Sequence, residues 1–387
     1  MSVHLTRRDA LKLLGVSSAG AALGCRADAP PAGRSPAARS PAAEAGRAGH
    51  DAVLSVAPLQ TPWQTEDPFL FCMHHLDRFP AGNAVMGPPR ASLAGRRLGN
   101  DFGGRDGWNM YHGDRVPGFP RHPHRGFETI TVVRQGLLDH SDSLGATARF
   151  GEGDVQWLTA GAGIQHAEMF PLVRETAGNP LEFFQIWLNL PAARKMVEPH
   201  FSMLWAPTVP TLDVDDEVGQ RTRVTVVAGS FAGTPAAAAP PASYASEPGA
   251  HVTLLTLELQ AGAHFTLPAA TRGTARTLYF YEGREMRVGG RRVPASRAVR
   301  LAPEAEVDLV ASAGPAAAVL LGGRPIGEPV ARRGPFVMNT PQEIRQAFSD
   351  YQRTQFGGWP WPSPEPVHPR PEGRFALRPD GRIERPA

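Results

Sequence analysis

The sequence of 387 residues has very little lysine, which we interpret as a bias of the genome and not as a sign of function. Lys12 and Lys195 are the only lysines, so arginine carries nearly all of the positive charge. The formal net charge is only +3, and Arg7, Arg8 and Lys12 against Asp9 contribute +2 of it. The other arginines are scattered among acidic residues and form no basic stripe. We therefore expect no nucleic-acid partner.

Cysteine is equally scarce, since Cys25 and Cys72 are the only two. A framework of disulfides is excluded by this number, and we interpret Cys72 as a small apolar residue of the core. Long helical patterns are also rare, because 41 glycines and 39 prolines punctuate the chain. These residues predict many turns and few long helices.

Residues 1–25 are typical of an export signal. Thr6-Arg7-Arg8-Asp9-Ala10-Leu11-Lys12 resembles the twin-arginine pattern, except that Ala10 stands where a large apolar residue is usual. The apolar stretch that follows ends at Leu23 and is too short to span a bilayer, which needs about 20 apolar residues. Ala22-Leu23-Gly24-Cys25 resembles a lipoprotein processing site. We expect an exported protein, either periplasmic or anchored at the cell envelope through a lipidated Cys25, with a flexible Ala/Pro-rich tether over residues 26–60.

The middle of the chain has the pattern of an all-β protein. Runs rich in Val, Ile, Thr, Phe and Leu are separated by Gly, Pro and Asp, and this spacing predicts barrels or sandwiches. Seven runs are expected to be strands: 129–133, 154–158, 181–190, 223–227, 252–257, 277–281 and 317–321.

A weak internal repeat relates the two halves of this region. Arg125-Gly126 stands eleven positions before Gly136, and Arg272-Gly273 stands eleven positions before Gly283, at an offset of 147 residues. In this alignment, His122 corresponds to Ala269 and His124 to Thr271. The second half is thus expected to repeat the architecture of the first without its histidines.

Two short motifs carry the chemistry. The side chains of His122 and His124 point to the same face of an extended chain, so both imidazoles can reach one point. His166 and Glu168 repeat this geometry after an interval of 42 residues, counted from His124. Three nitrogens and one oxygen suit Fe, Mn, Ni, Cu or Zn and leave positions open for a substrate. The sequence therefore predicts one divalent metal ion held by these four residues.

Several segments together resemble the pirin family of bicupins. The segment from Gly118 to Thr129, which contains His122 and His124, looks like the hallmark of the family. The resemblance extends from about residue 68 to 356 and includes 140–145, 153–161, 163–168, 185–191 and 334–341.

This resemblance implies two tandem cupin-type β-barrels with a C-terminal helix. Residues 61–200 would form the N-terminal metal-binding cupin domain, and residues 201–335 a C-terminal cupin-like domain without metal ligands. Residues 336–387 would add a helix and a Pro-rich tail. The helix is also indicated by Thr340-Pro341-Gln342-Glu343, a typical helix start with a capping box.

The family also implies iron, as Fe(II), in the N-terminal barrel, with Mn, Ni, Cu and Zn as alternatives. It assigns the metal to His122, His124, His166 and Glu168, and Glu168 is additionally our candidate for a catalytic proton acceptor. Glu128 is a rival ligand, or a hydrogen-bond partner of one, because His-x-His-x3-Glu is the general first motif of cupins.

Three details complete the set of candidate site residues. Ala167 stands where the family commonly has Ser, which puts a hydrogen bond near the metal in doubt. We expect His140 to be a hydrogen-bonded residue at the end of a strand, and His112 is a candidate for the mouth of a pocket.

The resemblance implies more than one function. Some bacterial relatives are flavonol dioxygenases, so we expect a quercetin 2,3-dioxygenase-type enzyme that uses O2 on a small aromatic or polyphenol substrate, as a monomer. The alternatives are a non-catalytic iron-binding, redox-sensing or co-regulator protein, and another metal-dependent reaction in the same pocket. The export signal sets this chain apart from intracellular relatives and disfavours a role as a partner of transcription.

Overall fold

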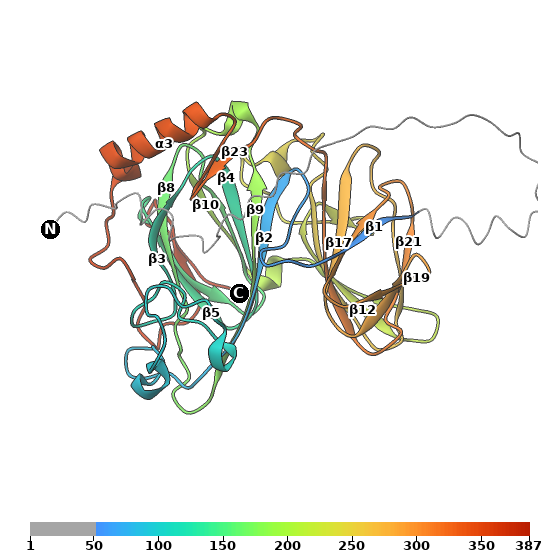
Figure 1. Cartoon of the computed structure of the whole chain (residues 1–387), viewed down its shortest axis with the longest axis horizontal. Coiled ribbons are helices and arrows are strands. Elements are labelled where there is room, and N and C mark those ends of the chain that lie inside the picture. The colour runs from blue at the N-terminus through green and yellow to red at the C-terminus, as the bar shows by residue number, and fades with distance from the viewer. Residues whose placement is uncertain (1–51) are drawn as a thin grey trace, which may run out of the picture.

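The computed structural model describes residues 52–387, which form two β-barrels side by side (Figure 1). The expected all-β fold of two cupin-type barrels with a C-terminal helix is confirmed. The export signal of residues 1–25 lies outside the described residues. Within residues 52–387, no helix is long and apolar enough to cross a membrane.

The first barrel consists of two antiparallel sheets. Its five-stranded sheet has the order β10 (His200–Leu204), β7 (Val155–Thr159), β4 (Phe127–Gln135), β9 (Asn179–Asn189) and β2 (Phe69–Phe79). Its six-stranded sheet has the order β26 (Ile383–Glu384), β25 (Phe375–Leu377), β6 (Thr147–Gly151), β5 (Leu137–Asp142), β8 (Ile164–Met169) and β3 (Gly118–His124).

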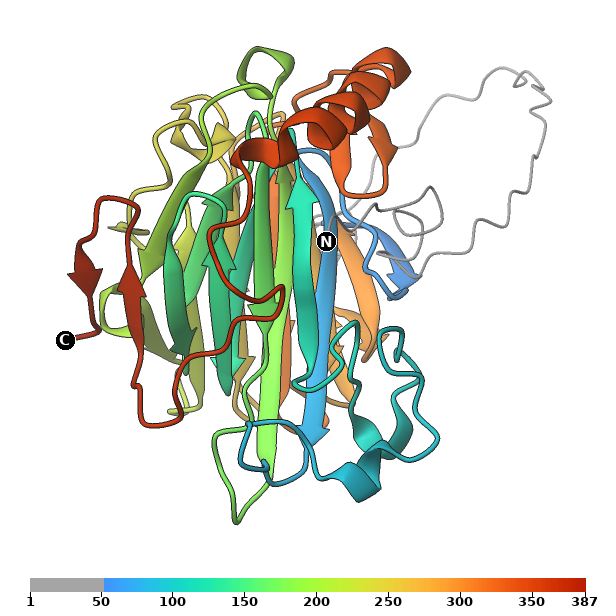
Figure 2. The ribbon, with the colours of Figure 1, turned by 90° about the vertical axis from the view of Figure 1, so that its left-hand side faces the viewer.

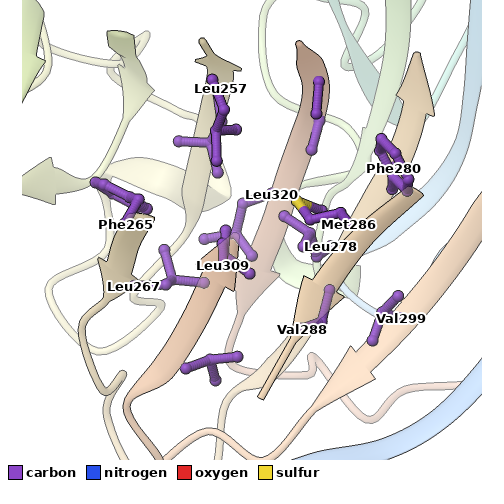
Figure 3. Packing of buried hydrophobic residues seen from close by; sticks show 14 of the residues in the cluster. Leu257, Phe265, Leu267, Leu278, Phe280, Met286, Val288, Val299, Leu309 and Leu320 are labelled. Atoms are coloured by element: carbon purple, nitrogen blue, oxygen red, sulfur yellow. The ribbon is translucent and has the colours of Figure 1, made fainter. Parts of the chain in front are cut away.

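The second barrel repeats this plan with a seven-stranded and a four-stranded sheet. The larger sheet has the order β1 (Val53–Pro58), β20 (Arg297–Leu301), β17 (Ala275–Glu282), β22 (Ala316–Gly323), β15 (Thr253–Leu259), β12 (Arg221–Ala228) and β11 (Thr211–Asp215). The smaller has the order β16 (His264–Leu267), β21 (Val307–Val310), β18 (Glu285–Val288) and β19 (Arg291–Pro294). Figure 3 shows that apolar side chains such as Leu278, Phe280 and Leu309 fill the space between the sheets.

The seven expected strands all lie at strands of the structure, and the internal repeat is confirmed in β4 and β17. Gly126 and Gly273 precede these strands with φ of 86° and 80°, and Gly136 and Gly283 follow them with φ of 85° and 130°. Glycine populates such positive φ values without the steric cost that other residues incur. The repeated glycines therefore mark equivalent turns in the two barrels.

Two expected boundaries differ from the structure. Residues 53–58, which we placed in the tether of 26–60, form β1 and pair with β20 of the second barrel. The boundary between 200 and 201 falls inside β10, which pairs with β7 of the first barrel. Strand pairing over long distances decides both points, and local composition does not reveal it. The part of the tether before residue 52 lies outside the described residues.

The segment after the second barrel returns to the first barrel. A short hairpin of β23 (Ala331–Arg333) and β24 (Phe336–Met338) leads into α3 (Pro341–Thr354). Thr340 and Glu343 form the expected capping box, and Ile344, Ala347 and Tyr351 pack against the hairpin. In Figure 2, α3 lies across one end of the first barrel and the tail runs along its side to β25 and β26.

Candidate metal centre

The three predicted histidine ligands come together on two neighbouring strands. β3 and β8 pair antiparallel, and His122 lies directly opposite His166. His124 follows on the same face of β3, so the ligand nitrogens of the three residues all lie within 4.8 Å of one another. All three side chains are buried. The cluster therefore has the donor atoms and the spacing to hold one metal ion.

The ring nitrogens are arranged for ligation by Nε2. His122 Nδ1 lies 2.9 Å from the carbonyl oxygen of Pro120, and His124 Nδ1 lies 3.3 Å from that of Pro335. An Nδ1–H that donates to a carbonyl leaves the lone pair of Nε2 for a metal. Among the described residues, neither ring nitrogen of His166 has a hydrogen-bond partner. Buried ring nitrogens normally have a partner, so the unpaired nitrogens of His166 fit the role of a metal ligand.

Burial also keeps these imidazoles neutral. It lowers the pKa of His122 to about 4 and the pKa values of His124 and His166 well below their ordinary value. Metal ions bind the neutral form of histidine, so no proton has to be displaced from the rings near pH 7.

The carboxylate of Glu168 lies beside the cluster. It is two residues beyond His166 on β8, and its Oε2 atom is 3.8 Å from His166 Nε2. Gln185 Nε2 donates to both carboxylate oxygens at 2.9 and 2.7 Å, and Thr131 Oγ1 lies 3.5 Å away. Burial raises the pKa of Glu168, and the bonds from Gln185 oppose that shift. The three histidines form the compact group, and the role of Glu168 as fourth ligand stays a prediction.

Glu128, the rival ligand, faces away from the cluster. The chain turns at Gly126, where φ is 86°, so Glu128 begins a new strand and does not continue the face of His124. Its carboxylate accepts hydrogen bonds from Thr159 Oγ1 at 2.7 Å and from Ser243 Oγ at 2.6 Å. Ser243 belongs to the second half of the chain. Glu128 therefore links the two barrels and bonds to none of the predicted ligands.

Aromatic side chains surround the histidines. The ring centroid of Phe119 lies 6.3 Å from that of His122, and the centroid of Trp187 lies 5.4 Å from that of His124. His112 is half-buried beside Phe119, with 5.8 Å between the ring centroids. His112 therefore lies at the aromatic wall next to the cluster, and its expected place at the mouth of a pocket stays a prediction.

Polar side chains of the barrel interior were missed by the sequence analysis. Gln156 lies opposite Thr131 in the β4–β7 ladder, so both share the face that contacts Glu168. Thr129 is on the same face, and neither Thr129 Oγ1 nor the amide of Gln156 has a partner among the described residues. Strand alternation around Gln185 and Trp187 could have indicated such a face, but the strand register was not known.

His140 is hydrogen-bonded, as expected. Its Nε2 atom lies 3.0 Å from Asp142 Oδ2, and its ring centroid lies 5.6 Å from that of His166. His140 lies opposite Glu168 in the β5–β8 ladder, so it is on the same face as His166, but it is not one of the three grouped histidines.

Comparison with known proteins identifies the family. Residues 98–188 match the family model described as pirin, and residues 254–357 match the model described as the pirin C-terminal cupin domain. A pirin-like protein of Caulobacter vibrioides is 35% identical over 291 residues, which cover 72% of this chain and 99% of that protein. The chain belongs to the pirin family.

Other similar proteins bear on the chemistry of this pirin. A Pseudomonas aeruginosa protein that carries the provisional name of a quercetin 2,3-dioxygenase is 38% identical over 242 residues, covering 62% of this chain and 80% of its own length. The crystal structure of a quercetin 2,3-dioxygenase from Acinetobacter baumannii matches with a TM-score of 0.62 and 25% identity, over 79% of this chain and 98% of that one.

Ala167 is the departure from the family pattern noted in the sequence. It alternates with His166 and Glu168 on β8, so its side chain faces away from the cluster. Ser141 lies opposite it on β5, and its hydroxyl is paired with Thr147 Oγ1 at 2.8 Å. A hydroxyl at position 167 would thus lie on the far side of the strand from the ligands, and its absence leaves the cluster of this pirin unchanged.

The C-terminal hairpin closes the centre of this pirin from one side. Val337 N donates to the carbonyl oxygen of Arg125 at 3.0 Å, next to the turn that follows His124. A Cβ atom on Gly126 would lie 1.9 Å from the carbonyl oxygen of Val337, so only glycine permits this approach. The hairpin comes from beyond the second barrel, and sequence patterns near the histidines do not predict it.

Proposed function

We propose that this pirin is a metal-dependent dioxygenase that cleaves a ring of flavonol-like polyphenols with O2, in the manner of a quercetin 2,3-dioxygenase. The observation that carries the proposal is the buried cluster of three neutral histidines with the carboxylate of Glu168 beside it. The likeness to the quercetin 2,3-dioxygenase of Acinetobacter baumannii supports the same reaction class.

The donor set fits a first-row transition metal, and we propose Fe(II) held by His122, His124, His166 and Glu168. When bound, such an ion supplies a Lewis acid that favours an ionised substrate hydroxyl and open positions that hold substrate and O2 together.

Glu168 is the residue we propose as the proton acceptor. Its burial raises its pKa, which makes it a stronger base than an exposed carboxylate. Gln185 holds both of its oxygens by hydrogen bonds of 2.9 and 2.7 Å, so the carboxylate is oriented before a substrate arrives. A hydroxyl proton of the substrate would move to one of these oxygens.

The surroundings of the cluster suit a flat aromatic molecule with several oxygens. Phe119 and Trp187 provide aromatic surfaces beside His122 and His124. The hydroxyl of Thr129 and the amide of Gln156 are buried and unpaired among the described residues, so they are free to bond a hydroxyl or carbonyl of the substrate.

The experiment is O2 consumption by the mature, iron-loaded chain with quercetin. We expect O2 uptake that accompanies the loss of quercetin and that vanishes in His124→Ala. His264→Ala is the control, because His264 is exposed on β16 of the second barrel. Stoichiometric metal binding without O2 uptake would instead support a non-catalytic iron-binding or redox-sensing protein.

A further inference from the structure

The second barrel contains a cavity of about 240 Å³ at one of its ends. Leu255, Leu267 and Leu320 form an apolar part of its wall and belong to the core of the barrel. Figure 3 shows Leu267 and Leu320 within this core. Thr271 and Arg276 are among its polar lining residues, and no acidic side chain is among the described residues that line it. His251 also lines the cavity but is exposed, so Arg276 carries the one buried positive charge of this partly apolar cavity.

This cavity is the counterpart of the metal centre in the first barrel. Ala269 and Thr271, which correspond to His122 and His124 in the repeat, both line it. Arg276 corresponds to Thr129 at the same offset of 147 residues. At the positions that correspond to the metal centre, the second barrel thus has small side chains in place of imidazoles, and it adds a guanidinium.

Arg276 faces the inside of the barrel. It precedes Leu278 and Phe280 by two and four positions on β17, and both of these belong to the apolar core shown in Figure 3. Only 3% of Arg276 is exposed. Its side chain therefore lies between the apolar interior and the cavity.

The guanidinium of Arg276 is only half paired. Nη1 donates to the carbonyl oxygens of Pro303 and Ala305, each at 3.1 Å. Nε and Nη2 have no partner among the described residues and are closed off from the cavity as well as from solvent. Burial lowers the pKa of Arg276 to about 10, so the group remains charged near neutral pH. A buried charge whose donors are unpaired is destabilising, and such groups are normally matched by a partner.

The two unpaired nitrogens indicate the shape of that partner. Nε–H and one N–H of Nη2 lie parallel on the same edge of a guanidinium, which is the edge that binds both oxygens of a carboxylate. A monoanion would neutralise Arg276 without bringing a second charge among the leucines. A phosphate dianion would leave one charge uncompensated, since no other arginine or lysine is among the residues that line the cavity.

We propose that the second barrel is a binding site for a small monocarboxylate with an apolar body. When the ligand enters, the Arg276 side chain turns so that Nε and Nη2 face the cavity and pair with the carboxylate, and the apolar body lies against Leu255, Leu267 and Leu320. Benzoate has this chemistry and suits the volume of the cavity. The site is distinct from the metal centre and does not depend on the proposed dioxygenase activity.

The test is calorimetric titration of benzoate into the full, metal-loaded chain and its variants. We expect saturable binding that weakens at least about tenfold in Arg276→Met, because two charge-assisted hydrogen bonds are lost. Arg276→Lys keeps the charge but loses the parallel donors, so it should also bind more weakly. Arg287→Met, an exposed arginine on β18 of the same barrel, should bind as the wild type does.

Further measurements separate this site from the alternatives. Benzoate binding should persist in His124→Ala, and its loss there would place benzoate at the metal centre and overturn the proposal. Equal affinity in wild type and Arg276→Met would overturn it as well. Binding of inorganic phosphate but not of benzoate, lost in Arg276→Met, would overturn the assignment to a carboxylate.

Thermal unfolding gives a second readout that does not depend on activity. Without ligand, Arg276→Met should have a melting temperature at or above that of the wild type, because an unpaired buried charge has been removed. Benzoate should raise the melting temperature of the wild type and leave that of Arg276→Met unchanged. An equal rise in both proteins would contradict the proposed site. Arg276→Gln provides the same comparison if Arg276→Met does not fold.

Discussion

The Nδ1 atom of His124 lies 3.3 Å from the carbonyl oxygen of Pro335, although 211 positions separate the two residues. Pro335 directly precedes β24, whose first residue, Phe336, bridges to Arg125 next to the histidine. A histidine ligand is oriented by the acceptor on its other ring nitrogen. The geometry of the metal centre thus depends on a hairpin that the chain forms only after it has completed the second barrel.

Arg125→Met should weaken metal binding although Arg125 is not a ligand. Its Nε donates to the carbonyl oxygen of Ala162 at 2.6 Å, and its Nη1 pairs with Asp350 of α3 at 2.8 Å. Losing these bonds loosens α3 from the barrel, and with it the hairpin that packs against α3. We expect about a tenfold loss of affinity, as is common for residues that support metal ligands. Competition with a chelator of known affinity measures it.

Arg353→Met is the matched control for this variant. Arg353 also pairs with Asp350, at 3.1 Å, but its side chain is exposed on α3. Its removal should leave the affinity for the metal unchanged. Equal metal affinities of the wild type, Arg125→Met and Arg353→Met would show that the hairpin and α3 do not affect metal binding.

Glu168→Gln should separate metal binding from turnover. The three histidines remain, so we expect the variant to retain its metal, while the loss of the proton acceptor lowers kcat by about 100-fold or more. Metal content by mass spectrometry and O2 uptake with quercetin measure the two effects. Glu128→Gln is the control, since Glu128 is a buried carboxylate of the same barrel that faces away from the histidines. Unchanged kcat in Glu168→Gln would rule out the proposed role.

Much of the centre could be predicted because its geometry is local. Two-residue spacing places His122 and His124 on one face, and the only long-range step was that β8 returns beside β3. The capping box at Thr340 likewise specifies the start of α3 from four neighbouring residues.

The errors come from features that local patterns do not contain. Glu128 was a rival ligand because of the His-x-His-x3-Glu spacing, but the turn at Gly126 separates it from the strand of His124. β1 was assigned to the tether because its partner β20 lies about 240 residues later in the sequence. The support of His124 by Pro335 and the orientation of Glu168 by Gln185 also join distant segments.

The export signal remains a prediction that can be tested in cells. Replacing Arg7 and Arg8 together by lysine should leave the protein in the cytoplasm, because the arginine pair is the expected recognition element. Fractionation of cells that express the full chain measures this. Arg34 and Arg39, replaced by lysine in the same way, are the control. Export of both forms alike would contradict a twin-arginine signal.

Attachment of a lipid is a separate question at Cys25. If the cysteine is acylated, the exported protein should be found in the membrane fraction, and Cys25→Ala should release it as a soluble protein. A wild type that is soluble after export would show that Cys25 is not acylated.

Glu128 should make the stability of the protein depend on pH. Its side chain is fully buried, and this burial raises its pKa from an ordinary 4.5 to about 7, although hydrogen bonds from Ser243 and Thr159 oppose the shift. The folded protein therefore keeps the proton on Glu128 to a higher pH than the unfolded chain does. The stability that this proton contributes is full below about pH 4.5 and is lost as the pH rises through about 7.

Comparison with Glu128→Gln isolates this contribution, because the amide has no proton to lose in this range. Between about pH 5 and about pH 8, the free energy of unfolding of the wild type should fall relative to that of the variant by on the order of 2 kcal/mol. Denaturant titrations at the two pH values measure the difference. Glu217→Gln, at an exposed residue, should keep the pH dependence of the wild type. A constant difference between wild type and Glu128→Gln would mean that the carboxyl group stays ionised between the barrels throughout this range, held by Ser243 and Thr159.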